Sequence, residues 1–208
     1  MKKPFYIIVL ASGNGTNLGA IIEAKNSRKL QNVEILGVIS NRDAGALEKG
    51  REYGCPTVLL PSKGKTPEQY DEELIKMIVE LEDLESEAVG KEVRVDLICL
   101  IGYMNILTPE FIQDFEGKII NVHPSLLPHY GGKGMYGDAV HEAVLASGDK
   151  ETGMTIHYVT EEVDAGEMIL QVSVSVEADD TIETLRQKVQ AEEKLGYVEV
   201  LKRLSSGS

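Results

Sequence analysis

Cysteine is scarce in this sequence. The 208 residues include two cysteines, Cys55 and Cys99, far apart along the chain. Two distant cysteines suggest neither a disulfide framework nor a zinc site, so we expect a reducing compartment. Cys99 lies inside the apolar run Leu97–Ile101, where we expect it to be a small core residue.

Positive charge and long apolar runs are scarce too. Lysine and arginine total 21 against 34 acidic residues, a formal net charge of −13, which argues against nucleic acid as a partner. No apolar run approaches the ~18 residues that span a bilayer. The first run, Phe5–Ala11, is followed at once by Ser12-Gly13-Asn14-Gly15, which indicates a strand and not a signal peptide. We therefore expect a cytoplasmic protein with no membrane partner, whose anionic ligands are held by local dipoles and a few placed cations.

What the sequence does contain is an alternation of short apolar runs with helical segments. The runs predict strands buried on both faces, namely Tyr6–Leu10, Glu34–Ser40, Thr57–Leu60, Asp96–Ile101 and Lys118–Val122. Near the end, Gly153–Val159 and Glu167–Val176 predict an antiparallel pair, followed by a helix from Thr181 to about Leu204. The sequence thus predicts one α/β domain over 1–208: a Rossmann-like, mostly parallel sheet with helices on both faces and an antiparallel C-terminal strand pair.

One predicted helix has clear boundary signals. Thr66-Pro67-Glu68-Gln69 combines an N-cap, a proline at the first helical position and a capping-box glutamine. The apolar face that follows is predicted at Tyr70, Leu74, Met77, Ile78, Leu81 and Leu84. The acidic remainder, as far as Glu92, is expected to be a solvated helix end and loop, and Ser205–Ser208 a frayed terminus.

Ligands of parallel sheets bind outside the carboxyl ends of the strands, and unusual residues follow the first predicted strand. The turn Ser12–Asn17 leads into a helix, whose N-terminal N–H groups could hold a phosphate. Simple turn formation is the alternative. The glycine spacing misses the dinucleotide fingerprint by one residue, and the absence of a Gly-Lys-Ser or Gly-Lys-Thr sequence excludes a P-loop.

Further candidates follow the fourth and fifth predicted strands. Gly102 opens the loop Tyr103–Leu107, which could hold a flat heteroaromatic ligand or be an ordinary buried loop. Asn121 and His123 are two positions apart, so their side chains share one face of a strand. An amide donor beside an imidazole suits a tetrahedral oxyanion, and the imidazole can also relay a proton. Asp164, in the turn between the last two strands, is either a turn residue or the group that orients His123 and favours its charged form.

Together these residues resemble the folate-dependent formyltransferase family. Its signature is an asparagine, one residue and then His-Pro-Ser-Leu-Leu-Pro, followed downstream by an aspartate before small residues. Asn121–Pro128 and Asp164-Ala165-Gly166 match that order and spacing, and the resemblance extends from Tyr6 to about Leu201. It implies transfer of a formyl group from 10-formyltetrahydrofolate, as co-substrate, to an amine, with no metal. Within the family, the turn Ser12–Asn17 is similar to that of members that formylate glycinamide ribonucleotide in de novo purine biosynthesis.

The resemblance also implies roles for individual residues. Asn121, His123 and Asp164 would form the catalytic trio, with Asn121 touching the amine substrate as well. The binding residues would be Gly15, Thr16 and Asn17 for the phosphate, Glu193 for the ribose, and Met104, Asn105, Ile106 and Leu107 for the folate. The small-molecule substrates would be the partners of a monomer or a homodimer.

Two segments depart from the family pattern. The loop Gly131–Gly137 is longer than in many relatives and glycine-rich, so we expect a mobile lid in which Lys133 meets a phosphate or a folate carboxylate. Close relatives often carry an arginine where Pro67 stands, so Lys63 or Lys65 is expected to replace it. Both departures concern the binding of the carrier.

Four alternatives remain open at this stage. A sugar-nucleotide or other small-amine formyltransferase would share the trio, and only the glycine turn argues against it. A formyl-folate hydrolase usually has an N-terminal regulatory domain, whereas here the first strand is predicted at Tyr6. A formyltransferase acting on initiator tRNA needs a second, basic domain. A non-catalytic nucleotide-binding module would leave Asn121, His123 and Asp164 without a role.

Overall fold

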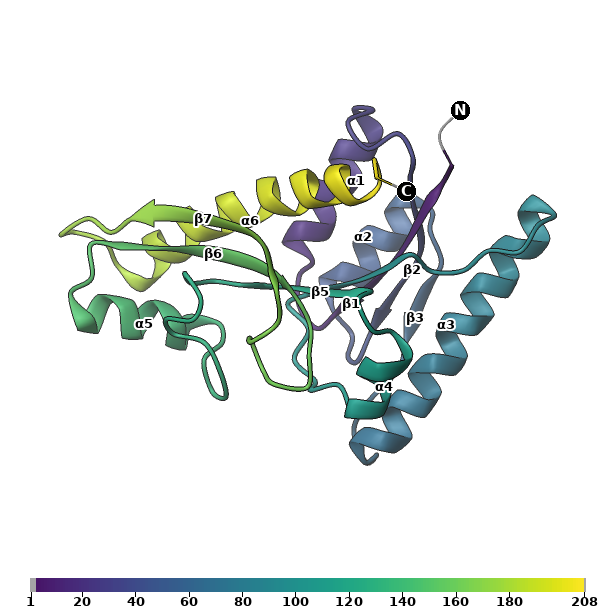
Figure 1. The fold of residues 1–208 in the computed structure, drawn as a ribbon, viewed down its shortest axis with the longest axis horizontal. Helices are drawn as coiled ribbons and strands as arrows, with labels where there is room; N and C mark the ends of the chain where they lie inside the picture. The colour runs from purple at the N-terminus through teal and green to yellow at the C-terminus, as the bar shows by residue number, and fades with distance from the viewer. Residues whose placement is uncertain (1–2, 208) are drawn as a thin grey trace.

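The computed structural model describes residues 3–207, which form a seven-stranded sheet in the order β3-β2-β1-β4-β5-β6-β7 (Figure 1). The first five strands run parallel, and β6 and β7 are antiparallel to their neighbours. Their bounds are β1 (Phe5–Ala11), β2 (Val33–Ser40), β3 (Thr57–Leu59), β4 (Leu97–Ile101), β5 (Ile119–His123), β6 (Glu151–Tyr158) and β7 (Met168–Ser175). The predicted mostly parallel Rossmann-like sheet is confirmed.

Helices cover both faces of this sheet, because successive side chains of each central strand point to opposite faces. In β1, Ile7 and Val9 belong to one buried cluster while Ile8 and Leu10 belong to another. The helices α1 (Thr16–Asn26), α2 (Gly45–Tyr53) and α6 (Ile182–Leu204) contribute to the first cluster. The second cluster is covered by α3 (Pro67–Val89) and α4 (Pro109–Asp114), and α5 (Asp138–Ser147) packs against α6.

The local signals of α3 are confirmed in part. Thr66 caps the helix through a complete capping box with Gln69. The helix continues through the acidic segment to Val89, and Leu84 is 55% exposed, so its place on the buried face was predicted wrongly. Leu84 lies within the last two turns of α3, and this end of the helix projects beyond the sheet (Figure 1).

Two other expectations are corrected. The strand β3 is the edge of the sheet, and its Leu59 is 47% exposed, so it is not buried on both faces. Ser205 is buried and is not frayed: its carbonyl accepts a hydrogen bond of 2.6 Å from Asn32 Nδ2, which ties the end of α6 to the start of β2. Ser208 lies outside the described residues.

The topology brings the unusual segments to one edge of the sheet. The carboxyl ends of β1, β4 and β5 are adjacent, so the glycine turn, the loop after β4 and the proline-containing loop after β5 are neighbours. Ser12 Oγ accepts a hydrogen bond of 2.9 Å from the Met104 amide, which joins the first two of these segments. Among residues 3–207, none of the helices is both long enough and apolar enough to cross a membrane.

Candidate active site

Two residues at the end of β5 open the candidate site. Asn121 and His123 lie on the same face of the strand, and His123 is only 3% exposed. Across the antiparallel ladder, Asn121 is directly opposite His157 of β6. The Asn121 Nδ2 atom lies 3.4 Å from His157 Nε2. A third polar group, beyond the predicted pair, therefore belongs to this face of the sheet.

Both nitrogens of the His123 ring face an oxygen atom. Nε2 lies 2.7 Å from the carbonyl oxygen of Tyr130, and Nδ1 lies 3.4 Å from Asp164 Oδ2. A carbonyl oxygen only accepts hydrogen bonds, so Nε2 carries a proton in this arrangement. Nδ1 is then the position at which the ring gains its second proton, directly opposite the carboxylate.

The Asp164 side chain lies between two buried imidazoles. Besides the contact with His123, its Oδ1 atom is 3.5 Å from His157 Nε2, and Oδ2 accepts a hydrogen bond of 2.9 Å from the Gly132 amide. The backbone of Asp164 adopts a left-handed conformation, with φ of 58°, which is unusual for a residue other than glycine. The turn between β6 and β7 thus aims this carboxylate at the end of β5.

The Asp164 carboxyl is tuned toward its ionised form. Burial acts to raise its pKa, but the interactions with His157, the Gly132 amide and His123 outweigh burial and hold the pKa below its ordinary value. An ionised carboxylate between two imidazoles can attract a proton to either ring. The arrangement therefore suits proton transfer as well as ring orientation.

For His123 the net electrostatic effect is opposite to the expectation from sequence. Burial lowers the pKa of the imidazole, and it outweighs Asp164 and the Tyr130 carbonyl, which both act to raise it. The nearby His157 lowers it further. Asp164 acts in the expected direction, but burial outweighs it, so the pKa of His123 lies below its ordinary value, because the ring is almost completely removed from water.

His157 is the site residue that the sequence did not identify. It is 2% exposed, and its Nδ1 atom donates to the carbonyl of Tyr158 at 2.9 Å. A histidine inside an alternating strand resembles a core residue, so the local pattern carries no signal. Its partner, Asn121, becomes visible only when β6 is placed antiparallel to β5.

A second group of predicted residues meets at the N-terminus of α1. Gly15 is the N-cap with φ of 64°, and none of the described side chains caps the helix there. Asn17 Nδ2 donates to Glu193 Oε2 at 3.1 Å, so residues from both ends of the sequence come together. Burial raises the pKa of the Glu193 carboxyl, and the bond from Asn17 opposes this effect. The helix end offers free amide donors beside a carboxylate, which suits a phosphate with an adjoining hydroxyl group.

The predicted folate-binding loop is divided by exposure. Met104 and Ile106 are 46% and 70% exposed, and Asn105 Oδ1 accepts a hydrogen bond of 2.6 Å from Asn41. Leu107, by contrast, is buried in the core beneath α3 and α4. Three of the four loop residues are therefore available to a ligand, and Leu107 anchors the loop.

The glycine-rich loop lies next to the trio. Its Gly132 amide is the donor to Asp164, and Gly132 and Gly134 have φ of 91° and 90°. Lys133 is exposed. Of the two lysines expected to replace the missing arginine, Lys65 pairs with Glu73 at 2.5 Å and Lys63 is exposed. Within residues 3–207, no cluster of three or more His, Cys, Asp or Glu side chains has the arrangement of a metal site.

Comparisons with known proteins identify the family of this chain. The formyl transferase family model matches residues 5–201. A phosphoribosylglycinamide formyltransferase of Escherichia coli K12 is 38% identical over 97% of this chain and 87% of its own length. A chloroplastic phosphoribosylglycinamide formyltransferase of Arabidopsis thaliana is 37% identical over 94% of this chain, which spans 63% of that relative.

A solved structure is similar as well. The phosphoribosylglycinamide formyltransferase of Coxiella burnetii, in complex with CHES, superposes with a TM-score of 0.84 at 39% identity, over 99% of this chain and 89% of that one. The family match covers nearly the whole sequence, and it includes every residue of the two groups described above. The chain belongs to the formyl transferase family.

Proposed function

We propose that this protein transfers the formyl group of 10-formyltetrahydrofolate to the amine of glycinamide ribonucleotide, a step of de novo purine biosynthesis. The observation that carries the proposal is the convergence of Asn121, His123 and Asp164 at the carboxyl end of β5. Relatives with this activity in their names are 37% and 38% identical to the chain over nearly its whole length. We treat residues 1–208 as one formyltransferase domain.

In this reaction the amine nitrogen forms a bond to the formyl carbon, the bond from that carbon to N10 of the folate breaks, and one proton passes from the amine to N10. The Asn121 amide donates a hydrogen bond to the formyl oxygen, on which negative charge develops. The Nε2–H group of His123 is already engaged by the Tyr130 carbonyl, so His123 donates to the formyl oxygen through Nδ1 once that nitrogen is protonated. The Asp164 carboxylate stabilises positive charge on His123 as that charge develops, and it receives the amine proton directly or through water.

The two substrates bind at two separate groups of residues: the ribonucleotide at the N-terminus of α1, and the folate at the loop after β4. The amides of Gly15, Thr16 and Asn17 hold the phosphate of the ribonucleotide, and Glu193 accepts hydrogen bonds from its ribose hydroxyls. Met104, Asn105 and Ile106 present side chains and backbone to the folate ring. Ser12 couples the two binding segments through its hydrogen bond to Met104.

An assay with each component omitted in turn tests this proposal. The full chain is incubated with 10-formyltetrahydrofolate and glycinamide ribonucleotide, and formylated ribonucleotide and free formate are measured by mass spectrometry. We expect formylated ribonucleotide only when both substrates are present. Formate release without the amine would indicate a hydrolase, and formylation of a sugar-nucleotide amine in preference to glycinamide ribonucleotide would also contradict the proposal.

A further inference from the structure

Tyr130 is connected to the candidate site through its backbone. Its carbonyl oxygen lies 2.7 Å from His123 Nε2, and its backbone is left-handed, with φ of 55°. A tyrosine rarely adopts this conformation unless other contacts impose it. The direction of the carbonyl therefore depends on whatever holds Tyr130 in place.

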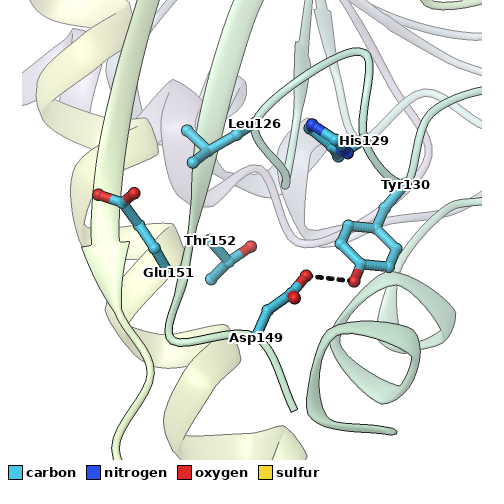
Figure 2. Close-up of a pocket in the computed structure, with 6 residues that line it drawn as sticks. All are labelled: Leu126, His129, Tyr130, Asp149, Glu151 and Thr152. Carbon is cyan, nitrogen blue, oxygen red and sulfur yellow. Dashed lines mark hydrogen bonds between the residues drawn. The ribbon is translucent and has the colours of Figure 1, made fainter. Parts of the chain in front are cut away.

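Hydrogen bonds of the phenol group, outside the candidate site, hold Tyr130 in place. Tyr130 OH donates to Asp149 Oδ2 at 2.5 Å (Figure 2). Ser147 Oγ lies 2.7 Å from the same hydroxyl group. Both partners lie at the C-terminal end of α5, and the Asp149 amide in turn donates to Ser147 Oγ at 3.2 Å. This hydrogen bond to Asp149 is also the main reason why the pKa of Tyr130 is raised.

One side of the Tyr130 ring is not held by close packing. Beside the Tyr130 ring is a cavity of about 290 Å³, whose wall also includes Leu126, His129, Glu151 and Thr152 (Figure 2). A ring with open space next to it is not fixed by close contacts. The bonds to the end of α5 therefore hold the ring, and they act on the carbonyl together with the hydrogen bonds of the loop itself, from Ser125 Oγ to the His129 carbonyl and from the Gly131 amide to the Pro128 carbonyl.

We propose that Tyr130 is a positioning residue for formyl transfer, and that its phenol tether to Asp149 holds the backbone carbonyl that keeps the His123 ring in its Nε2–H form. This inference rests on the proposed function. With the tether in place, Nδ1 faces Asp164 and the ring exchanges its second proton there. Without the tether, the carbonyl turns away, and His123 can also populate the form in which Nδ1 already carries the proton and the ring cannot gain its second proton opposite Asp164.

The test compares Tyr130→Phe, which keeps the ring and removes the hydroxyl, with Tyr53→Phe, a phenol at the far end of α2. Nitrogen chemical shifts of His123 are measured by long-range ¹H–¹⁵N NMR and assigned by their loss in His123→Asn. In Tyr130→Phe we expect a mixture of the two neutral ring forms and a kcat about 5- to 10-fold lower, with each KM changed less than about 2-fold. The alkaline fall in rate should move to lower pH, because the Tyr130 carbonyl, as the acceptor of the hydrogen bond from His123, stabilises the charged ring, and losing this bond lowers the pKa of His123 further. Tyr53→Phe should match the wild type.

A second variant covers the case in which Tyr130→Phe folds poorly. Asp149→Ala removes the acceptor and should reproduce the same shift and rate loss, and the double variant should be no worse than either single one. Unchanged His123 nitrogen shifts and an unchanged pH profile in both variants would overturn the proposal. If the wild-type chain formylates no amine, the proposed function fails, whereas the nitrogen shifts still decide whether the tether sets the form of the ring.

Discussion

Asp164 Oδ2 lies 3.4 Å from His123 Nδ1, although the two residues come from different strand ends and are joined only by the fold. Both side chains are nearly inaccessible to water, at 9% and 4% exposed. In such a site the electrostatic interaction between the carboxylate and the imidazole is screened far less than at the surface. The charge of Asp164 should accordingly be visible in the titration of the activity.

Replacing that carboxylate is the first test. Asp164→Asn keeps the size of the side chain but removes the charge that raises the pKa of His123, so the pKa falls further below its ordinary value. The turnover rate should fall about 10²- to 10⁴-fold. Because a less basic His123 is protonated only at lower pH, the optimum of the remaining activity should move down. pH–rate profiles measure both effects.

Asn121→Ala is the matched control for this shift. It removes an amide donor that does not titrate, so we expect slower turnover with the pH optimum in its original place. Near wild-type turnover of Asp164→Asn across the pH range would return Asp164 to the role of an ordinary turn residue.

The second prediction concerns His157, whose interaction with Asp164 lowers the pKa of the carboxyl. His157→Leu removes this interaction, so the pKa of Asp164 should rise toward its ordinary value. If the ionised carboxylate is the active form, the acid limb of the pH–rate profile should move to higher pH, and kcat should fall about 10-fold. His157→Gln retains a polar group and should show a smaller shift. An acid limb that stays in place in His157→Leu would show that the carboxylate does not depend on this ring.

The sequence pattern marked Asn121 and His123 because they lie where an apolar run ends, whereas Asp164 joined the trio only through the resemblance to the formyltransferase family. Strand ends are visible in a local pattern, and the direction of a parallel sheet then places them at one edge. His157 lies inside a strand, and its role depends on the register between β5 and β6, which is a long-range property. The lowering effect of burial on the pKa of His123 was missed for a similar reason: the extent of its burial is not encoded in its neighbours along the chain.

The sequence predicted the fold about as well as it predicted the site. Branched apolar runs and capping signals gave the strands and helix starts, because both depend on short-range chemistry. The edge position of β3 and the exposure of Leu84 depend on where the sheet stops and on how far a helix projects beyond it. The tether from Tyr130 to the end of α5 joins an unusual backbone conformation to a loop, and the sequence carries no periodic signal for either.

The third prediction concerns the structural role of the glycine turn. Gly15 has φ of 64°, and a Cβ atom there would lie 2.9 Å from Ala46 Cα. Gly15→Ala should lower the free energy of unfolding by about 1–2 kcal/mol through backbone strain, with the contact adding to it. A Cβ at Gly13 would meet no atom within 4 Å, so Gly13→Ala should change stability little. Chemical denaturation of both variants checks this difference, and equal losses would contradict it.

Acid should destabilise the protein partly through His141. This residue of α5 is 2% exposed, and its Nδ1 atom has no hydrogen-bond partner among residues 3–207. Burial lowers its pKa, and Arg186 and His123 act in the same direction while Asp138 opposes them. A folded-state pKa below the unfolded value means that the unfolded chain binds more protons, so stability falls as pH drops below about 7. At one pH unit below the unfolded pKa of a histidine, the loss in the free energy of unfolding is at most about 1.4 kcal/mol per histidine.

Denaturation at pH 7.5 and 5.5 should show a smaller difference for His141→Gln than for the wild type, because glutamine does not titrate. The exposed His129 provides the control, and His129→Gln should keep the wild-type difference. Asp164 also loses its contribution in acid, but only in a lower window near the ordinary pKa of aspartate, because its folded-state pKa is lowered. A His141→Gln variant with the full wild-type loss between pH 7.5 and 5.5 would assign that loss to His123 and other groups instead.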